Sequence, residues 1–113
     1  MKYKNDLIKY FEAFSDKNID TISEMFSDDV ELVDWNISVS GKEKVVEANN
    51  SIFSSIETIQ VTPISFYLNS ETSYAVQISI LINGEEKLDA IDVIKFDNNG
   101  LIKSIVAFKL ENE

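Results

Sequence analysis

Long stretches of the second half of this chain alternate between apolar and polar residues, which is the pattern of β-strands with one buried face. From Tyr74 to Ile82 every second residue is apolar, and the alternation resumes, with one exception, over residues 87–97. Asn83-Gly84 stands between the two segments, and this dipeptide favours a tight hairpin turn. The two segments are therefore predicted to be neighbouring antiparallel strands.

Two further strands are predicted beside this hairpin. Residues 58–69 alternate but change phase near Pro63, which indicates a bulge or bend of the kind that makes a sheet curl. Residues 97–100, Asp-Asn-Asn-Gly, form a turn signal before a last strand over residues 101–110. An EF-hand loop would need an acidic residue where Phe108 stands, so calcium binding is not expected.

Helical spacing of apolar residues precedes these strands. It predicts helices over residues 3–15 and 19–26, the second capped by Asn18. A short strand is predicted over residues 30–34. Residues 40–43, Ser-Gly-Lys-Glu, fit a capping box that opens a third helix. Helices followed by a run of strands predict an α+β class, with the helices on one face of a curved sheet.

Asp92 is the exception to the alternation. It shares its predicted strand face with four apolar residues, Leu88, Ala90, Ile94 and Phe96. A carboxylate on an apolar face loses hydration, which raises its pKa unless a donor or a cation compensates. Carboxylates of this kind cluster at functional sites. Alternatively, Asp92 lies at the sheet margin or forms a structural hydrogen bond with neighbouring backbone.

The composition restricts the chemistry that the chain can perform. It has 113 residues, 44% of them hydrophobic, which predicts one globular domain over residues 1–113. Histidine and cysteine are absent, so acid–base chemistry would use Asp, Glu, Tyr or Lys, and no His or Cys metal site can form. We expect no metal and no cofactor. The net charge of −10 argues against nucleic acid and anionic membranes as partners.

No segment has the features of a targeting or membrane-spanning sequence. Charged residues interrupt the first 14 residues, so we expect no signal peptide there. No apolar run approaches the length of a transmembrane helix. A cytoplasmic location is the expectation.

Taken together, these segments resemble the nuclear-transport-factor-2-like superfamily, which includes ketosteroid isomerases and SnoaL-like polyketide cyclases. The resemblance covers nearly the whole chain and rests on residues 10–14, 18–22, 25–34, 40–43 and 91–102. It implies a cone-shaped α+β fold, in which a curved, mostly antiparallel sheet wraps around the N-terminal helices.

The resemblance also implies a site with three functional residues. Tyr10 matches the oxyanion-hole tyrosine of the isomerases, Asp34 their catalytic base, and Asp92 their protonated oxyanion-hole aspartic acid. Two positions depart from the isomerases. Trp35 stands where they have a proline after the base, and Asn49 stands where they have a supporting tyrosine on the third helix.

Several of these residues also have a purely structural interpretation. Tyr10 also fits the core-facing stripe of its helix, and Asp34 also fits a residue that bonds the loop at a strand end. Trp35 also fits packing between that loop and the helix, and Phe53 also fits the core. If the cavity exists, we expect its lining to include Phe14, Trp35, Asn49, Phe53 and Ile94.

The expected function is binding of a small apolar or carbonyl-bearing molecule, with proton transfer on an enolisable carbonyl compound as an isomerase or cyclase reaction. The alternative is a non-catalytic module for ligand binding or dimerisation. Ala75, Leu81, Ile91 and Val93 lie on the second face of the predicted hairpin, so both faces of the sheet are partly apolar. A homodimer through the outer sheet face is therefore expected.

Overall fold

The fold contains three helices and six strands in the part of the chain that the computed structural model describes, residues 1–111. In chain order they are α1 (Lys4–Ser15), α2 (Ile19–Met25), β1 (Phe26–Val33), β2 (Ser38–Ser40), α3 (Lys42–Ser55), β3 (Ile59–Ser70), β4 (Ser73–Ile82), β5 (Glu86–Phe96) and β6 (Ile102–Lys109). None of the helices in this range is long and apolar enough to cross a membrane.

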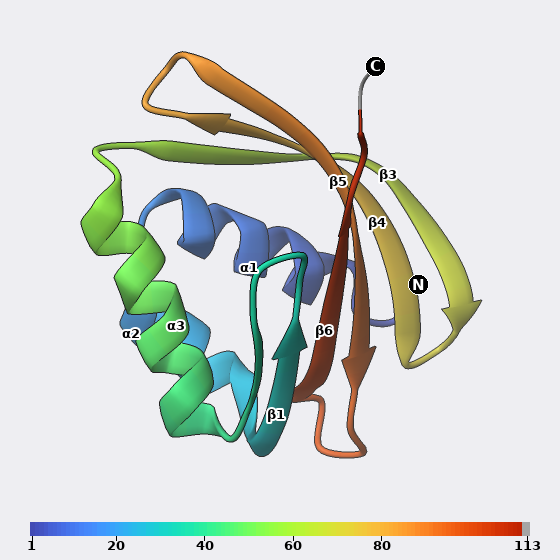
Figure 1. The fold of residues 1–113 in the computed structure, drawn as a ribbon. Helices are drawn as coiled ribbons and strands as arrows, with labels where there is room; N and C mark the ends of the chain where they lie inside the picture. The colour runs from blue at the N-terminus through green and yellow to red at the C-terminus, as the bar shows by residue number, and fades with distance from the viewer. Residues whose placement is uncertain (112–113) are drawn as a thin grey trace.

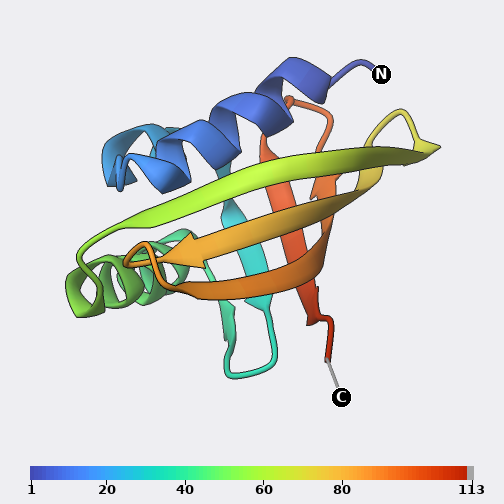
Figure 2. The ribbon, with the colours of Figure 1, turned by 90° about the horizontal axis from the view of Figure 1, so that it is seen from above.

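The strands form one mixed sheet in the order β2-β1-β6-β5-β4-β3. Neighbouring strands are antiparallel except β1 and β6, which run parallel. The sheet bends strongly, and the three helices lie on its concave side (Figures 1 and 2). Among the helices, α1 packs mainly against β3, and α3 packs mainly against β1. The predicted α+β arrangement, with helices on one face of a curved and mostly antiparallel sheet, is confirmed.

Strand alternation decides which side chains face the helices. On β5 the buried residues are Ala90, Asp92, Ile94 and Phe96, while the residues between them are exposed or half-buried. The phase change predicted near Pro63 is a bulge, because the pairing of β3 with β4 shifts register between Pro63 and Ser65. The sheet is therefore bent at the strand that packs on α1.

Aromatic side chains fill one end of the space between α1 and the sheet. The rings of Tyr3 and Phe96 stack with centroids 4.3 Å apart, and Tyr74 meets Phe96 edge-on at 5.9 Å. The Tyr74 hydroxyl donates to the carbonyl of Glu71 and accepts from the N–H of Tyr3. This end, beside the β3–β4 turn, is closed by packing, so any cavity must lie toward the other end.

Two predicted boundaries are wrong. The capping box at residues 40–43 does not form, because Ser40 pairs with Glu31 as the last residue of β2 and leaves Gly41 at the N-cap without a side-chain bond. Gly41 makes the turn instead, with φ 94° and its N–H bonded to the Val30 carbonyl at 2.8 Å.

The second wrong boundary is the start of β1. The strand begins at Phe26, although the polar residues 27–29 predict a break there. The pairing of β1 with β6 is irregular between Phe26 and Glu31, and Asp28 and Asp29 in this part of the strand are exposed. Within it the Ser27 hydroxyl donates to Asp29 at 2.9 Å.

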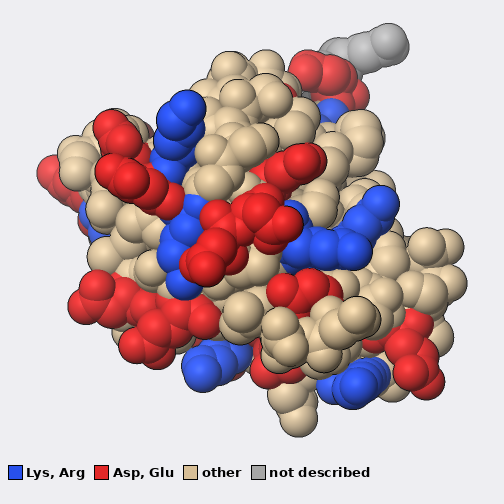
Figure 3. Space-filling view, turned by 90° about the horizontal axis from the view of Figure 1, so that it is seen from below, with Lys and Arg blue, Asp and Glu red and all other residues tan. Residues whose placement is uncertain are grey.

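Charged side chains of both signs are interspersed on the face seen from below in Figure 3. Acidic groups outnumber basic ones across the sequence, 20 to 10. No broad basic surface of the kind that binds nucleic acid is visible on this face.

Candidate functional site

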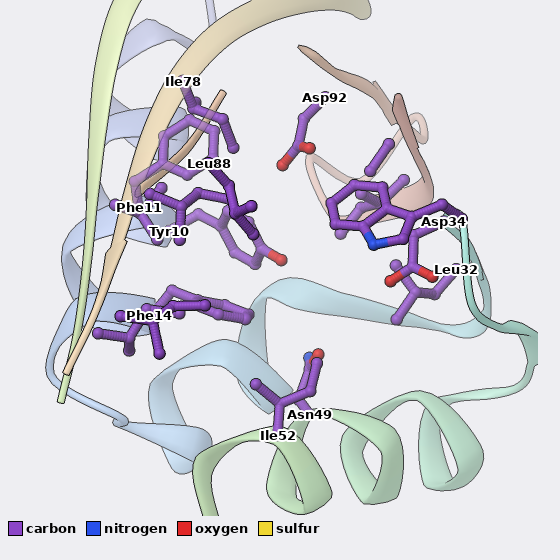
Figure 4. A pocket seen from close by; sticks show the side chains of 17 residues that line it. Tyr10, Phe11, Phe14, Leu32, Asp34, Asn49, Ile52, Ile78, Leu88 and Asp92 are labelled. Carbon is purple, nitrogen blue, oxygen red and sulfur yellow. The ribbon is translucent and has the colours of Figure 1, made fainter. Parts of the chain in front are cut away.

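A cavity of about 150 Å³ lies between α1, α3 and the concave face of the sheet. Figure 4 shows the side chains that line it. The lining is mostly apolar, and its polar members come from α1, α3, β5 and the loop after β1. The lining residues are Tyr10, Phe11, Phe14, Leu32, Asp34, Trp35, Asn49, Ile52, Ile59, Val61, Ile78, Ile80, Ile82, Leu88, Asp92, Ile105 and Ala107.

Asp92 reaches the cavity from the middle of β5. Its strand neighbours are Val76 on β4 and Ala107 on β6, both apolar. The side chain is buried, and it makes no hydrogen bond with any residue in the range 1–111. Burial, and secondarily the charge of Asp34, raise the pKa of Asp92 from 3.8 to about 7. Near neutral pH this carboxyl is therefore protonated in a large fraction of molecules.

Tyr10 projects into the cavity from α1. Its ring packs against Phe11, Phe14 and Phe26, and its hydroxyl points toward the space that Asp92 and Asp34 border (Figure 4). Burial, followed by the carboxyl of Asp92, raises the pKa of Tyr10 well above its usual value. The hydroxyl thus keeps its proton and can donate a hydrogen bond at any physiological pH.

Asp34 directly follows β1 and holds the loop between β1 and β2. Its Oδ1 accepts hydrogen bonds from the N–H groups of Asn36 at 2.7 Å and Ile37 at 2.9 Å. Its own N–H donates to the Ile37 carbonyl at 2.9 Å. The alternative interpretation of Asp34 as a loop-bonding residue is therefore correct for Oδ1. The same side chain also lines the cavity, and Oδ2 accepts no hydrogen bond from the residues that the structure describes.

Asn49 reaches the cavity from α3. It is 2% exposed, and its amide nitrogen is buried without a hydrogen-bond partner among residues 1–111. Trp35 lies in the loop after Asp34, is 42% exposed and also lines the cavity. Phe14 lines it as expected from the sequence, with its ring 4.8 Å from that of Phe53.

Two residues expected in the lining are not part of it. Phe53 is 7% exposed and packs edge-on against Phe14, which does line the cavity. Ile94 is fully buried between Tyr74 and Ile105 on the neighbouring strands, toward the closed end. Both belong to the core, and the core interpretation of Phe53 is the correct one.

Several lining residues were not expected from the sequence. Ile78, Ile80 and Leu88 lie on the inward faces that strand alternation already marks, and this signal could have found them. Ile59 and Ile82 lie near the ends of paired strands. Their contribution to the lining depends on how far the cavity extends along the sheet, which alternation does not specify.

Most of the chain matches a known domain family. A family model described as SnoaL-like domain matches residues 7–105. The chain belongs to the SnoaL-like domain family. No curated protein sequence matches it.

Solved structures support the same fold at low sequence identity. SalBIII, an epoxide hydrolase/cyclase-like enzyme of salinomycin pyran-ring formation, has a TM-score of 0.83 and 22% identity, covering 96% of this chain and 91% of its own. A protein from Kribbella flavida proposed to be a ketosteroid isomerase has a TM-score of 0.84 and 17% identity, and the match covers 99% of this chain and 80% of that protein. An NTF2-like protein of unknown function from Exiguobacterium sp. 255-15 has a TM-score of 0.82 and 16% identity, and the match covers 94% of this chain and 98% of that protein. At these identities the likeness concerns the fold of the SnoaL-like domain.

The SnoaL-like cavity carries carboxyl, phenol, indole and amide groups. Among residues 1–111 no three Asp, Glu, His or Cys side chains are grouped so that they could hold a metal ion. A protonated carboxyl and a phenol can donate hydrogen bonds, and an ionised carboxylate can accept a proton. The arrangement can therefore bind an oxygen atom and move a proton beside it.

Proposed function

We propose that this SnoaL-like domain binds a small carbonyl compound in its cavity and catalyses proton transfer at the carbon next to the carbonyl. The observation that carries the proposal is the pair formed by Tyr10 and Asp92 in an apolar cavity. Both groups have raised pKa values, so both are hydrogen-bond donors near neutral pH. A third group, Asp34, borders the same cavity and can accept a proton.

The roles follow from charge development during enolisation. Tyr10 and protonated Asp92 donate hydrogen bonds to the carbonyl oxygen, which becomes negative as the proton leaves. Donors that are already oriented stabilise such a charge strongly in an apolar site. Asp34 takes the proton on Oδ2, while Oδ1 remains bonded to the loop and fixes the direction of the carboxylate. Return of the proton to another atom of the ligand gives an isomerisation.

The cavity volume limits the ligand. Sites for drug-sized molecules have volumes of about 300–1,000 Å³, and this cavity has about 150 Å³. In another protein, an apolar cavity of about this volume admits benzene. We therefore propose a ligand with one ring or a short chain rather than a fused-ring steroid.

The test is exchange of α-protons for deuterium in a small ketone such as cyclohexanone, followed by NMR. Asp34→Asn removes the proton acceptor, yet its amide oxygen can still accept the two loop N–H bonds. We expect the exchange rate to fall by about a hundredfold or more. Asp28→Asn, at an exposed position on β1, the strand that precedes Asp34, is the matched control and should keep the rate.

Ligand binding is measured separately through Trp35, which is the sole tryptophan and lines the cavity. Asp34→Asn should keep binding, because Tyr10 and Asp92 remain. Exchange by the wild type no faster than in buffer would refute the catalytic proposal.

One observation favours a second candidate, a non-catalytic binding module. Asp34 already bonds two backbone N–H groups of its own loop, which gives it a structural role without any reaction. If the domain is such a module, phenols, which mimic an oxyanion, would bind in the cavity and quench the fluorescence of Trp35. No tested ketone would exchange its α-protons faster than in buffer.

We also propose a homodimer through the convex face of the sheet. Six apolar residues form an outer patch on this face: Tyr67, Ala75, Ile91, Val93, Val106 and Phe108. Tyr67, Ala75, Val93 and Val106 are successive partners across four strands, and Ile91 pairs with Phe108. Ile91 is 43% exposed and Phe108 is 58% exposed. Contiguous exposed apolar surface of this kind usually marks an interface.

A further inference from the structure

The Asn49 amide is a buried polar group of the cavity wall that the proposed reaction leaves without a role. Its Nδ2 is the one buried side-chain nitrogen or oxygen without a hydrogen-bond partner within residues 1–111. The residue lies on α3, is 2% exposed, and borders the cavity. It makes no hydrogen bond to Tyr10, Asp34 or Asp92. Asn49 therefore does not act by supporting those groups.

An unpaired amide is unfavourable at this place. A buried donor without an acceptor lowers stability by about 1–3 kcal/mol, and asparagine is also a weaker helix former than leucine. The neighbouring lining residue on the next turn of α3 is Ile52, so an aliphatic side chain fits the same wall. The fold alone would be more stable with leucine at position 49. A polar side chain that the fold does not use is explained when a bound molecule supplies the missing acceptor.

The position of Asn49 indicates where that acceptor lies. In Figure 4 the amide points into the cavity from α3, while Asp92 points in from the sheet on the opposite wall. The Tyr10 hydroxyl projects into the space between these walls. Apolar side chains, among them Phe14 and Leu88, line the cavity between its polar ends.

We propose that Asn49 binds a second oxygen atom of the ligand, so that the substrate class is a one-ring or short-chain compound with oxygen functions at both ends. This inference rests on the proposed function for the first oxygen, which Tyr10 and Asp92 hold. The second oxygen is a hydrogen-bond acceptor such as a ketone, ether or hydroxyl oxygen, and the Asn49 N–H donates to it. Asn49 thus selects the ligand and sets its orientation relative to Asp34.

The experiment compares two ligands that differ by one acceptor. Cyclohexane-1,4-dione has a second carbonyl oxygen, and 4-methylidenecyclohexanone has a CH₂ group of similar size in its place. Dissociation constants are measured by Trp35 fluorescence for the wild type and for Asn49→Leu. Asn50→Leu is the matched control, because it makes the same change at the adjacent, exposed position of α3.

We expect the wild type and Asn50→Leu to bind the dione more tightly than its analogue. In Asn49→Leu this preference should shrink by about three- to tenfold, as expected for one net hydrogen bond. Ligand-free Asn49→Leu should also melt at a higher temperature than Asn50→Leu, because the unpaired buried amide is removed. This second readout shows that the variant is folded.

Two results would overturn the inference. One is an equal preference for the dione in Asn49→Leu and the wild type. The other is a lower melting temperature of Asn49→Leu than of Asn50→Leu, which would assign the amide to the fold. Exchange of α-protons in 4-methylidenecyclohexanone, which lacks the second oxygen, tests the proposed function independently. Failure of that exchange leaves the binding comparison intact.

Discussion

A charged Asp92 is unfavourable at its place in β5, because the side chain is buried and Asp34 lies nearby. Its pKa is about 7 in the folded chain, against an ordinary value of 3.8. The folded state therefore holds this proton more tightly than the unfolded state does. Below about pH 4 both states are protonated and Asp92 has no effect. As the pH rises from about 4 to about 7 it lowers the free energy of unfolding, and above about 7 this loss is complete.

Asp92→Asn removes this titration and keeps the size of the side chain. We expect the variant to be more stable than the wild type above about pH 7, with the difference shrinking as the pH falls toward about 4. Urea denaturation across this range measures it. A variant less stable than the wild type above neutral pH would show that Asp92 is an ionised structural group.

The same substitution gives a second readout in catalysis. Protonated Asp92 donates a hydrogen bond and ionised Asp92 cannot, so α-proton exchange by the wild type should decline as the pH rises through about 7. The amide of Asp92→Asn keeps its N–H donors at every pH. Its rate should therefore lack this decline.

At the scale of elements, the start of α3 depends on the backbone of Gly41. Its φ of 94° and ψ of 139° lie in a region that residues with a Cβ rarely occupy. A Cβ added there meets no atom within 4 Å, so any loss on substitution comes from backbone strain. We expect Gly41→Ala to lower the free energy of unfolding by about 1–3 kcal/mol, measured by thermal or urea denaturation.

Gly84 supplies the control for this prediction. A Cβ at Gly84 also meets no atom within 4 Å, but its φ is 69°, in the left-handed region of the β4–β5 turn. Asparagine enters that region readily, as Asn83 already does with φ 54°. Gly84→Asn should therefore lose much less stability. Equal losses at the two positions would contradict the strain argument.

Local sequence predicts those elements whose pattern depends on one strand or one helix. The alternation of β5 places Asp92 inward, and the phase change at Pro63 marks the bulge in β3. The start of α3 could not be predicted in the same way, because Ser40 is withdrawn from the helix by pairing with β1. β2 has three residues, too few for a periodic pattern.

The three polar residues Tyr10, Asp34 and Asp92 were predictable for a different reason. Tyr10, Asp34 and Asp92 were placed by the family resemblance, and the structure brings all three to one cavity. The extent of the cavity was not predictable, because it depends on which aromatic side chains fill the closed end. Ile94 shares the inward face with Asp92, yet it lies on the filled side.

At the scale of the whole molecule, charge and the outer patch act in opposite directions. Two copies that each carry a charge of −10 repel one another, while burial of the outer patch favours association. Salt screens the repulsion and leaves the apolar contact intact. We expect a dimer at micromolar concentration that dissociates less at higher salt, as measured by light scattering or sedimentation.

A pair of substitutions tests where the dimer forms. Phe108→Ser should shift the equilibrium toward monomer, because Phe108 lies in the outer patch. Leu68 is exposed to nearly the same extent, 56% against 58%, but it pairs with the inward-facing Tyr74. Leu68→Ser should leave the equilibrium unchanged. A monomeric wild type, or equal effects of both changes, would contradict this interface.

The parallel pairing of β1 with β6 has a consequence for how the chain is made. During synthesis β1 leaves the ribosome roughly 70 residues before its long neighbour β6, since Leu32 pairs with Ile105. Until then β1 has the three-residue β2 as its sole strand partner. The cavity wall that contains Leu32 and Asp34 is therefore among the last parts of the chain to fold. A nascent chain that lacks β6 has no finished cavity, so the ligand cannot assist its folding and can stabilise only the completed protein.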